Sequence, residues 1–228
     1  MLYDEPLIRI MGDRAILVEL GDDISPRINR KVRALYVAAK DHRIKGIKDL
    51  VPSYRSLMVV YDPLVLALDS LESQINEIWN TLGDARLPES RTVEVPVVYG
   101  DKYGPDLEWI ADYHKMTPQE VIRLHTQPLY QVYMIGFMPG YTYMGEVPDA
   151  LVTPRRKTPR TRVPGGSVGI AQKQTGIYPV ASPGGWQIIG RTPLRLFDPQ
   201  RKSPCYLEMG DHVKFIVITE QELLQWRP

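Results

Sequence analysis

The first 85 residues combine two patterns of apolar positions, one typical of strands and one typical of amphipathic helices. Short apolar runs bounded by turn residues predict four strands, with the sequences LIRI, AILVEL, IKDLV and LMVVY. A first helix is predicted to begin at Ser25-Pro26, because serine caps helices and proline suits the first helical position. A second helix is predicted over 64–82, with apolar residues three and four apart and Gly83 at its end. This order of elements predicts a small α/β domain with both helices on one face of a sheet.

The rest of the chain consists mainly of short predicted strands. VEVPVVY predicts a strand, and two short helices follow, one beginning near Asp106 and one at a capping box that begins at Thr117. Six further strands are predicted, with the sequences QVYMIGF, SVGIA, GIYPVA, WQIIG, LRLF and HVKFIVI. Short strands separated by Pro, Gly and Asp favour a closed barrel. The polar segment 82–92 separates the two patterns, so the predicted domains are 1–85 and 86–228, and the predicted fold class is α+β.

The composition argues against several classes of protein. The formal net charge of +1 gives no reason to expect binding to nucleic acid or to an anionic membrane. No run approaches the ~18 apolar residues of a membrane span. Cys205 is the only cysteine, so no internal disulfide can form, and the opening MLYDEPLIRIMGD is not typical of a signal peptide. We therefore expect a cytoplasmic protein with no nucleic-acid or membrane partner.

The chain lacks the usual motifs of several catalytic chemistries. Its strings VPGGSVG and SPGGW lack the Lys-Ser/Thr pair of a phosphate-binding loop, so this chain alone is not expected to bind ATP. The four histidines are not at metal-ligand spacing, so no metal site is expected. Cys205 has no neighbouring histidine and no GxSxG motif is present, so the catalytic residues stay unknown. His125 is expected to be a hydrogen-bonded, partly buried residue rather than a proton carrier.

Two segments rich in arginine, glycine and proline are the candidates for a binding surface. In PRRKTPRTR, the cations either form a solvated basic loop or include one or two that hold a carboxylate or phosphate. In SPGGWQIIGRTP, the N–H groups of Gly184 and Gly185 are expected to form an anion pocket with Arg191. The competing interpretation of both segments is plain barrel turns. The predicted substrate-binding residues are Arg155, Arg160, Ser167, Gln174, Tyr178, Ser182, Gly184, Gly185, Trp186 and Arg191.

Three long strings also carry a family resemblance. They are GFMPGYTYMGEVP, PRRKTPRTRVPGGSVGIA and QTGIYPVASPGGWQIIGRTPLRLFDP. Together they resemble the allophanate hydrolase subunit 1 family, which includes the B subunit of 5-oxoprolinase and a sporulation-kinase inhibitor of the same build. In IAQKQTG, Gln172 stands where the family usually has a small residue, most often glycine.

The resemblance implies a small α/β domain followed by a cyclophilin-like β-barrel domain. It implies a component of an ATP-dependent 5-oxoprolinase, which acts with 5-oxoprolinase subunits A and C to open the lactam of 5-oxoproline to glutamate. ATP and Mg²⁺ are then expected at the level of the complex, and this chain is expected to be inactive alone. The alternative is a regulatory protein that binds and inhibits a sensor histidine kinase, and a third hypothesis is a binding module for another small acid. A cyclophilin-like barrel does not by itself imply prolyl isomerase activity.

Overall fold

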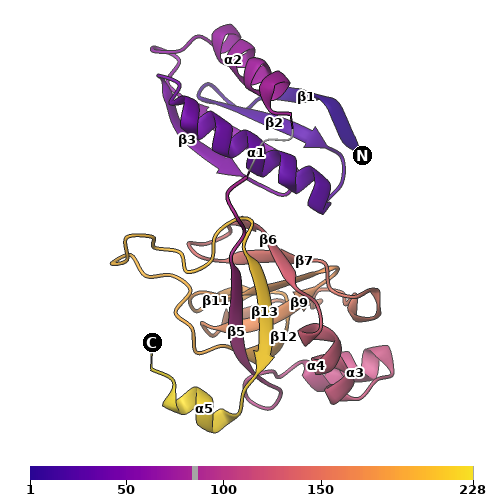
Figure 1. Ribbon diagram of the computed structural model, residues 1–228. Coiled ribbons are helices and arrows are strands. Elements are labelled where there is room, and N and C mark those ends of the chain that lie inside the picture. Colours follow the sequence, from indigo (N-terminus) through magenta and orange to yellow (C-terminus); the bar gives the residue numbers. More distant parts are fainter. Residues whose placement is uncertain (84–86, 228) are drawn as a thin grey trace. The chain divides into compact units, whose positions relative to one another are not determined.

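The computed structural model describes residues 1–83 and 87–227 (Figure 1). The chain divides into two compact units, Met1–Glu89 and Ser90–Pro228. The boundary predicted between residues 85 and 86 lies outside the described residues and stays a prediction. In the described part of the chain, no helix is long and apolar enough to cross a membrane.

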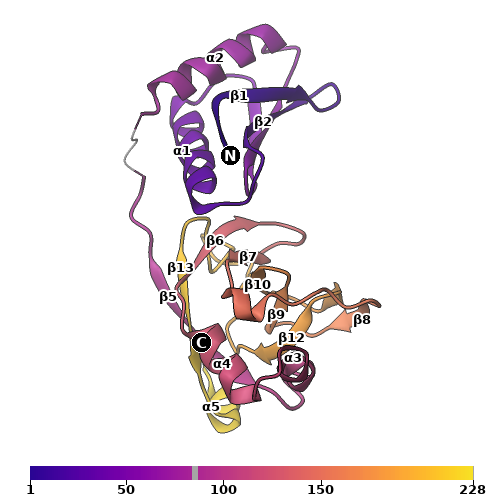
Figure 2. The same cartoon turned by 90° about the vertical axis from the view of Figure 1, so that its right-hand side faces the viewer.

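The first unit is a four-stranded antiparallel sheet in the order β1-β2-β4-β3, with two helices on one face (Figure 2). Its elements are β1 (Leu2–Ile10), β2 (Ala15–Gly21), α1 (Pro26–His42), β3 (Ile47–Pro52), β4 (Ser56–Tyr61) and α2 (Leu68–Thr81). In the central strands, Ile16 lies opposite Val59 and Val18 opposite Leu57, and all four are fully buried. Because strand side chains alternate between faces, these residues form one apolar face, which the helices cover. The predicted α/β arrangement is confirmed.

Of the two helices in this unit, the first begins where it was predicted and the second begins later. Ser25 caps α1 as predicted. Helix α2 begins at Leu68 rather than at residue 64. The Asp62 carboxylate accepts the N–H of Leu64 at 3.1 Å, and this local turn keeps the chain out of the helix until Leu68.

The second unit is a closed barrel of seven described strands, in the order β10-β7-β6-β13-β5-β12-β9. They are β5 (Thr92–Tyr99), β6 (Tyr130–Ile135), β7 (Thr142–Gly145), β9 (Ser167–Ala171), β10 (Gln174–Ile177), β12 (Gln187–Arg191) and β13 (His212–Val217). Strand β13 is parallel to β5, whereas the other paired strands are antiparallel. The prediction of a β-barrel domain after a small α/β domain is therefore confirmed.

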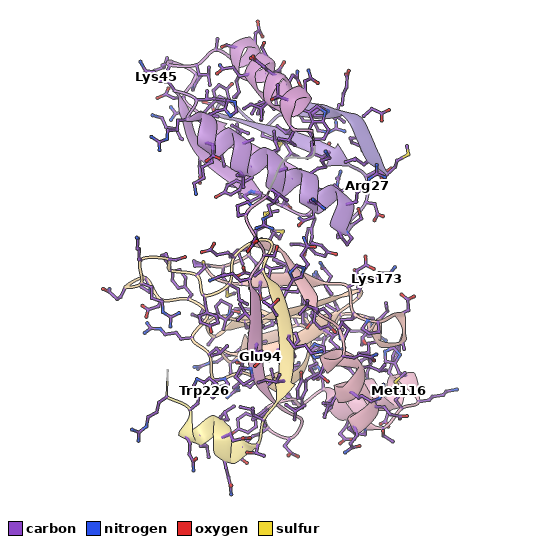
Figure 3. All side chains as sticks on the ribbon, viewed as in Figure 1. Arg27, Lys45, Glu94, Met116, Lys173 and Trp226 are labelled. Atoms are coloured by element: carbon purple, nitrogen blue, oxygen red, sulfur yellow. The ribbon has the colours of Figure 1, made fainter. Side chains whose placement is uncertain are left out.

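Shorter elements surround this barrel. They are α3 (Leu107–His114), α4 (Pro118–Thr126), a 3₁₀ turn (Asp149–Leu151), β8 (Arg160–Val163), β11 (Ser182–Gly184) and α5 (Glu220–Gln225). The predicted capping box at Thr117 is present at the start of α4. Met116, labelled in Figure 3, lies between α3 and α4 and packs against the barrel core. The prediction of a strand at LRLF is wrong, because Thr192 accepts the N–H of Leu194 in a turn and leaves Phe197 only an isolated bridge to Cys205.

The barrel strands separate two apolar layers. One layer fills the interior and includes Met144, Ile170 and Ile189. The other lies on the opposite face of the same strands and consists of Tyr141, Val163, Ala171, Tyr178, Trp186 and Ile188. Strands β8 and β11 pair with each other and supply part of this outer layer. The arginine- and glycine-rich segments therefore lie on the outside of the barrel.

Gln172 occupies the tight turn between β9 and β10 with a φ of +53°. A side chain is disfavoured in this left-handed region, whereas glycine enters it without cost from a Cβ atom. The backbone therefore accounts for the small residue that the family resemblance led us to expect at this position.

Candidate functional site

A buried carboxylate, Asp106, joins three segments that are far apart in the sequence. It lies immediately before α3 and is 3% exposed. It accepts hydrogen bonds from Arg156 at 2.8 Å and from Arg160 at 2.7 and 2.8 Å. It also accepts the backbone N–H of Ile188, in β12, at 2.6 Å. Charge-assisted bonds of this kind are among the strongest in proteins, so Asp106 fixes α3, the basic segment and β12 against one another.

The basic segment is divided between structural and exposed cations. Arg156 and Arg160 both form ion pairs with Asp106, and the backbone N–H of Arg156 donates to the carbonyl of Gly185 at 2.8 Å. Arg155 and Lys157 are exposed, and none of the ion pairs among the described residues involves them. Arg156 and Arg160 therefore hold the segment in place, and its other cations stay accessible. That one or two of the cations bind a carboxylate or phosphate of a ligand stays a prediction.

A pocket of about 520 Å³ opens where these segments meet. Its lining residues are Trp109, Tyr113, Pro154, Arg155, Arg156, Lys157, Thr158 and Gln187. The exposed rings of Trp109 and Tyr113, one turn apart on α3, stack with centroids 5.2 Å apart and planes at 22°. Another pocket of the same volume lies in the first unit, but none of the predicted site residues lines it. The pocket beside α3 is thus the candidate site of the described chain.

Gln187 forms the inner wall of this pocket. Its side chain is 3% exposed, and its Nε2 donates to the Pro154 carbonyl at 3.1 Å. Because Pro154 offers only an acceptor, this bond orients the amide and leaves Oε1 on the other side. Oε1 is buried and has no hydrogen-bond partner among the described residues. An unpaired buried acceptor costs about 1–3 kcal/mol, which marks this wall as polar and unsatisfied.

In SPGGW, the first glycine is required for packing, and the second is not. Gly184 lies in β11 with Tyr178 directly over it, so a Cβ atom there would overlap the tyrosine hydroxyl. Neither Gly184 nor Gly185 has the left-handed backbone that turns successive N–H groups toward one anion. The predicted pocket of paired glycine N–H groups is therefore not formed.

Arg191 does not join these glycines. It ends β12, at the opposite end from Gln187, and four residues of extended strand span roughly 13 Å. Its guanidinium lies over the Tyr103 ring at 5.5 Å, and its Nε has no partner among the described residues. Ser167, another predicted site residue, is paired with Arg191 across β9 and β12, and its buried hydroxyl is also unpartnered in the described chain. The structure thus separates Arg191 and Ser167 from the pocket beside α3.

Most of the other predicted residues surround the outer aromatic layer. The Tyr141 ring lies 5.0 Å from that of Tyr178 and 5.8 Å from that of Trp186. Burial raises the pKa of Tyr178, and the nearby Arg155 charge opposes part of this rise. Arg160 pairs with Gly184 across β8 and β11, and Ser182 begins β11. Gln174 lies apart, at the far end of β10 from Tyr178.

His125 belongs to the interior and is hydrogen bonded as predicted, although it is fully rather than partly buried. Its Nε2 lies 2.9 Å from the Thr175 hydroxyl, which itself donates to the Gly169 carbonyl. Its Nδ1 lies 2.9 Å from the Tyr99 hydroxyl. This network assigns a neutral ring with the proton on Nε2, and burial lowers the pKa of His125 to about 3. Among the described residues, no three His, Cys, Asp or Glu side chains are grouped to hold a metal ion.

Sequence reasoning missed Trp109, Tyr113 and Gln187 as pocket residues, and it missed Asp106 as the carboxylate that holds the segments around the pocket together. One signal was available, because Trp109 and Tyr113 are four residues apart on a helix whose other face is apolar. Two bulky aromatic residues on the polar side of a short helix are unusual for a purely solvated surface.

The fold and this pocket define a β-barrel module with an attached α/β domain, and comparisons with known proteins give its family. Residues 6–207 match the family model described as carboxyltransferase domain, subdomain C and D. The chain is 38% identical to the B subunit of 5-oxoprolinase from Bacillus subtilis (strain 168) over 225 residues, covering 94% of each chain. It is 40% identical to the B subunit of 5-oxoprolinase from Escherichia coli O157:H7 over 208 residues, covering 91% of this chain and 94% of the other. The chain therefore belongs to the carboxyltransferase domain, subdomain C and D, family.

A solved structure extends the comparison to a longer protein. The crystal structure of TTHA0988 matches with 37% identity and a TM-score of 0.81. The match covers 90% of this chain but only 40% of TTHA0988. This chain thus spans less than half the length of that structural relative, in which the module is joined to further sequence.

Proposed function

We propose that the chain is the B subunit of an ATP-dependent 5-oxoprolinase, which acts with subunits A and C to open the lactam of 5-oxoproline to glutamate. The observation that carries this proposal is the near-full-length identity of 38% and 40% to two proteins that are named as the B subunit of 5-oxoprolinase. Both relatives carry the name of the enzyme, so we prefer this function to the alternative of kinase inhibition. A cytoplasmic location is part of the same proposal.

The chemistry of the reaction explains why a single chain of this kind would not suffice. A lactam is stabilised by amide resonance, so its carbonyl must be activated before the C–N bond is opened by water. Phosphoryl transfer from ATP supplies that activation and needs cationic clamps and a metal ion around the phosphates. The described residues offer no cluster that fits a metal ion. We therefore assign ATP and Mg²⁺ to the complex and assign to this chain the binding and orientation of a reactant.

The names and lengths of the relatives support the proposal that this chain acts together with other subunits. Both curated relatives are named as one lettered component of an enzyme, and such a name belongs to a larger assembly. The 60% of TTHA0988 that this chain does not cover is consistent with a partner that is fused to the module in that protein. We propose that here the equivalent partner is a separate chain, the C subunit of the enzyme.

The test is reconstitution. The chain is co-purified with candidate subunits A and C from the same source, and glutamate release from 5-oxoproline is measured with and without ATP. We expect ATP-dependent release from the three-component mixture and none from this chain alone. Mixtures that omit one component at a time serve as controls. Activity that does not require this chain, or an assembled complex that releases no glutamate, would overturn the proposal.

A further inference from the structure

The pocket beside α3 has an excess of positive charge. Arg155, Arg156 and Lys157 line it, and no carboxylate is among its lining residues in the described chain. The buried acid that contacts this basic segment, Asp106, is already bonded to Arg156 and Arg160. One negative charge cannot balance the four cations around it, so Arg155 and Lys157 remain available to an anion. The planar fork of Arg155 suits a carboxylate, which it can bind through two parallel hydrogen bonds.

The aromatic part of the pocket lining suits a flat ring. Trp109 and Tyr113 are 44% and 53% exposed, although α3 buries its other face in the barrel core. Their stacked rings give the pocket a rigid apolar surface beside charged groups. A pocket with an aromatic wall and a few placed polar groups is the usual form of a small-molecule site.

From these two features we infer that the pocket beside α3 binds 5-oxoproline itself, with Arg155 on the carboxylate and Trp109 and Tyr113 against the ring. This inference rests on the proposed function, which supplies the identity of the lactam. Asp106 is a positioning residue, because it ties together α3, the basic segment and β12, which are the three walls. The lactam fills only part of a 520 Å³ pocket, which leaves room beside it for groups of the complex.

Binding is tested without catalysis by ¹⁹F NMR of the chain labelled with 5-fluorotryptophan, alone and in the complex. The four tryptophans give four resonances, and the resonance that is lost in Trp109→Phe is assigned to Trp109. We expect 5-oxoproline to shift the Trp109 resonance saturably and to leave Trp79, in the first unit, unchanged. A non-hydrolysable ATP analogue provides a second arm. A shift with the ATP analogue but not with 5-oxoproline, or no shift with either in the complex, would overturn the assignment.

Kinetics of the reconstituted complex give the second readout. Arg155→Ala is expected to raise the KM for 5-oxoproline about 10- to 100-fold, as expected when a charge-assisted bond is lost, and to change kcat less. Arg162→Ala is the matched control, because Arg162 is an exposed arginine of the same segment that does not line the pocket. Equal KM values for the two variants would contradict the inference.

The two experiments separate failure of this site from failure of the proposed function. If the wild-type complex releases no glutamate, the proposed function fails whatever the variants do. If the wild-type complex is active, but Arg155→Ala has the wild-type KM and 5-oxoproline does not shift the Trp109 resonance, the proposed function is retained and the proposed binding site is wrong.

Discussion

At the scale of single residues, Asp106 connects more segments of the site than any cation around it does. Replacing it by Asn keeps the shape but removes the charge that Arg156 and Arg160 share. Because both arginines are partly exposed, we expect Asp106→Asn to lower the free energy of unfolding by about 2–4 kcal/mol, rather than the upper end for fully buried pairs. Urea denaturation followed by circular dichroism measures this loss.

The matched control is Asp198→Asn. Asp198 also faces two arginines, but its nearer partner, Arg195, is 62% exposed. Ion pairs of that kind contribute about 0–1 kcal/mol, so the control should stay close to wild type. If both variants lost the same stability, Asp106 would not be the structural centre described above.

A second residue-scale prediction compares two adjacent glycines. Gly184→Ala should destabilise the second unit by about 1–3 kcal/mol, because its new Cβ atom must displace the Tyr178 ring. Gly185→Ala should be nearly neutral, since the nearest atoms to its Cβ belong to Pro159 at 3.6 and 3.7 Å. Thermal unfolding of the two variants tests this contrast. A neutral Gly184→Ala would show that Tyr178 moves freely and that the packing role is wrong.

At the scale of elements, α4 contributes a titrating group to the barrel interior. His125 has a pKa of about 3 in the folded chain and an ordinary value near 6.5 when unfolded. Between these values the unfolded chain binds a proton that the folded chain excludes, so stability falls as pH is lowered through this window. At about 1.36 kcal/mol per unit of pKa shift, the loss between pH 6.5 and 4 is about 3 kcal/mol.

The measurement is the urea midpoint as a function of pH for wild type and His125→Gln. The variant should be less stable at neutral pH but should lose less stability on acidification, because glutamine does not titrate. Burial also lowers the pKa of His114, yet His114 is present in both proteins and cancels in the difference. His42→Gln, at an exposed position, should follow the wild-type curve. Parallel curves for wild type and His125→Gln would refute this prediction.

Elements were predictable where the information was local. The cap at Ser25 and the capping box at Thr117 are written in adjacent residues, and both are present. LRLF shows the limit, because its two leucines pack on the core while the turn at Thr192 keeps them out of the sheet. Burial and strand pairing are separate properties, and an apolar run in the sequence indicates only burial.

At the scale of the whole molecule, the division at Glu89 predicts an autonomous second unit. Every described barrel strand and the whole interior core lie between Ser90 and the C-terminus. A fragment of residues 90–228 should therefore fold alone and unfold cooperatively, as expected of a domain with its own core. Differential scanning calorimetry of the fragment, with the intact chain as control, measures this. A fragment without a cooperative transition would mean that the barrel depends on the first unit.

The long-range arrangement of the chain explains why the site was only partly predictable from the sequence. The basic segment was recognised as a candidate, but its pocket also needs α3 and the start of β12, about 50 and 30 residues away. No spacing along the chain relates such segments. The proposed cluster of Arg191 with Gly184 and Gly185 failed for the converse reason, since a strand keeps residues that are near in sequence apart in space.

The parallel pairing of β5 with β13 has a consequence for the synthesis of the protein. Thr92 lies beside His212, so one edge of β5, the first strand of the barrel, stays unpaired until β13, the last strand, has been made. On a ribosome, more than a hundred residues must be translated before the cylinder can close. Until then β5 is paired with β12 on one side, and its other side is an unpaired strand edge. Such an edge can pair with strands of other nascent chains. High-level expression therefore exposes this protein to misassembly during translation, and slower translation or a chaperone that shields the waiting strand should raise its soluble yield.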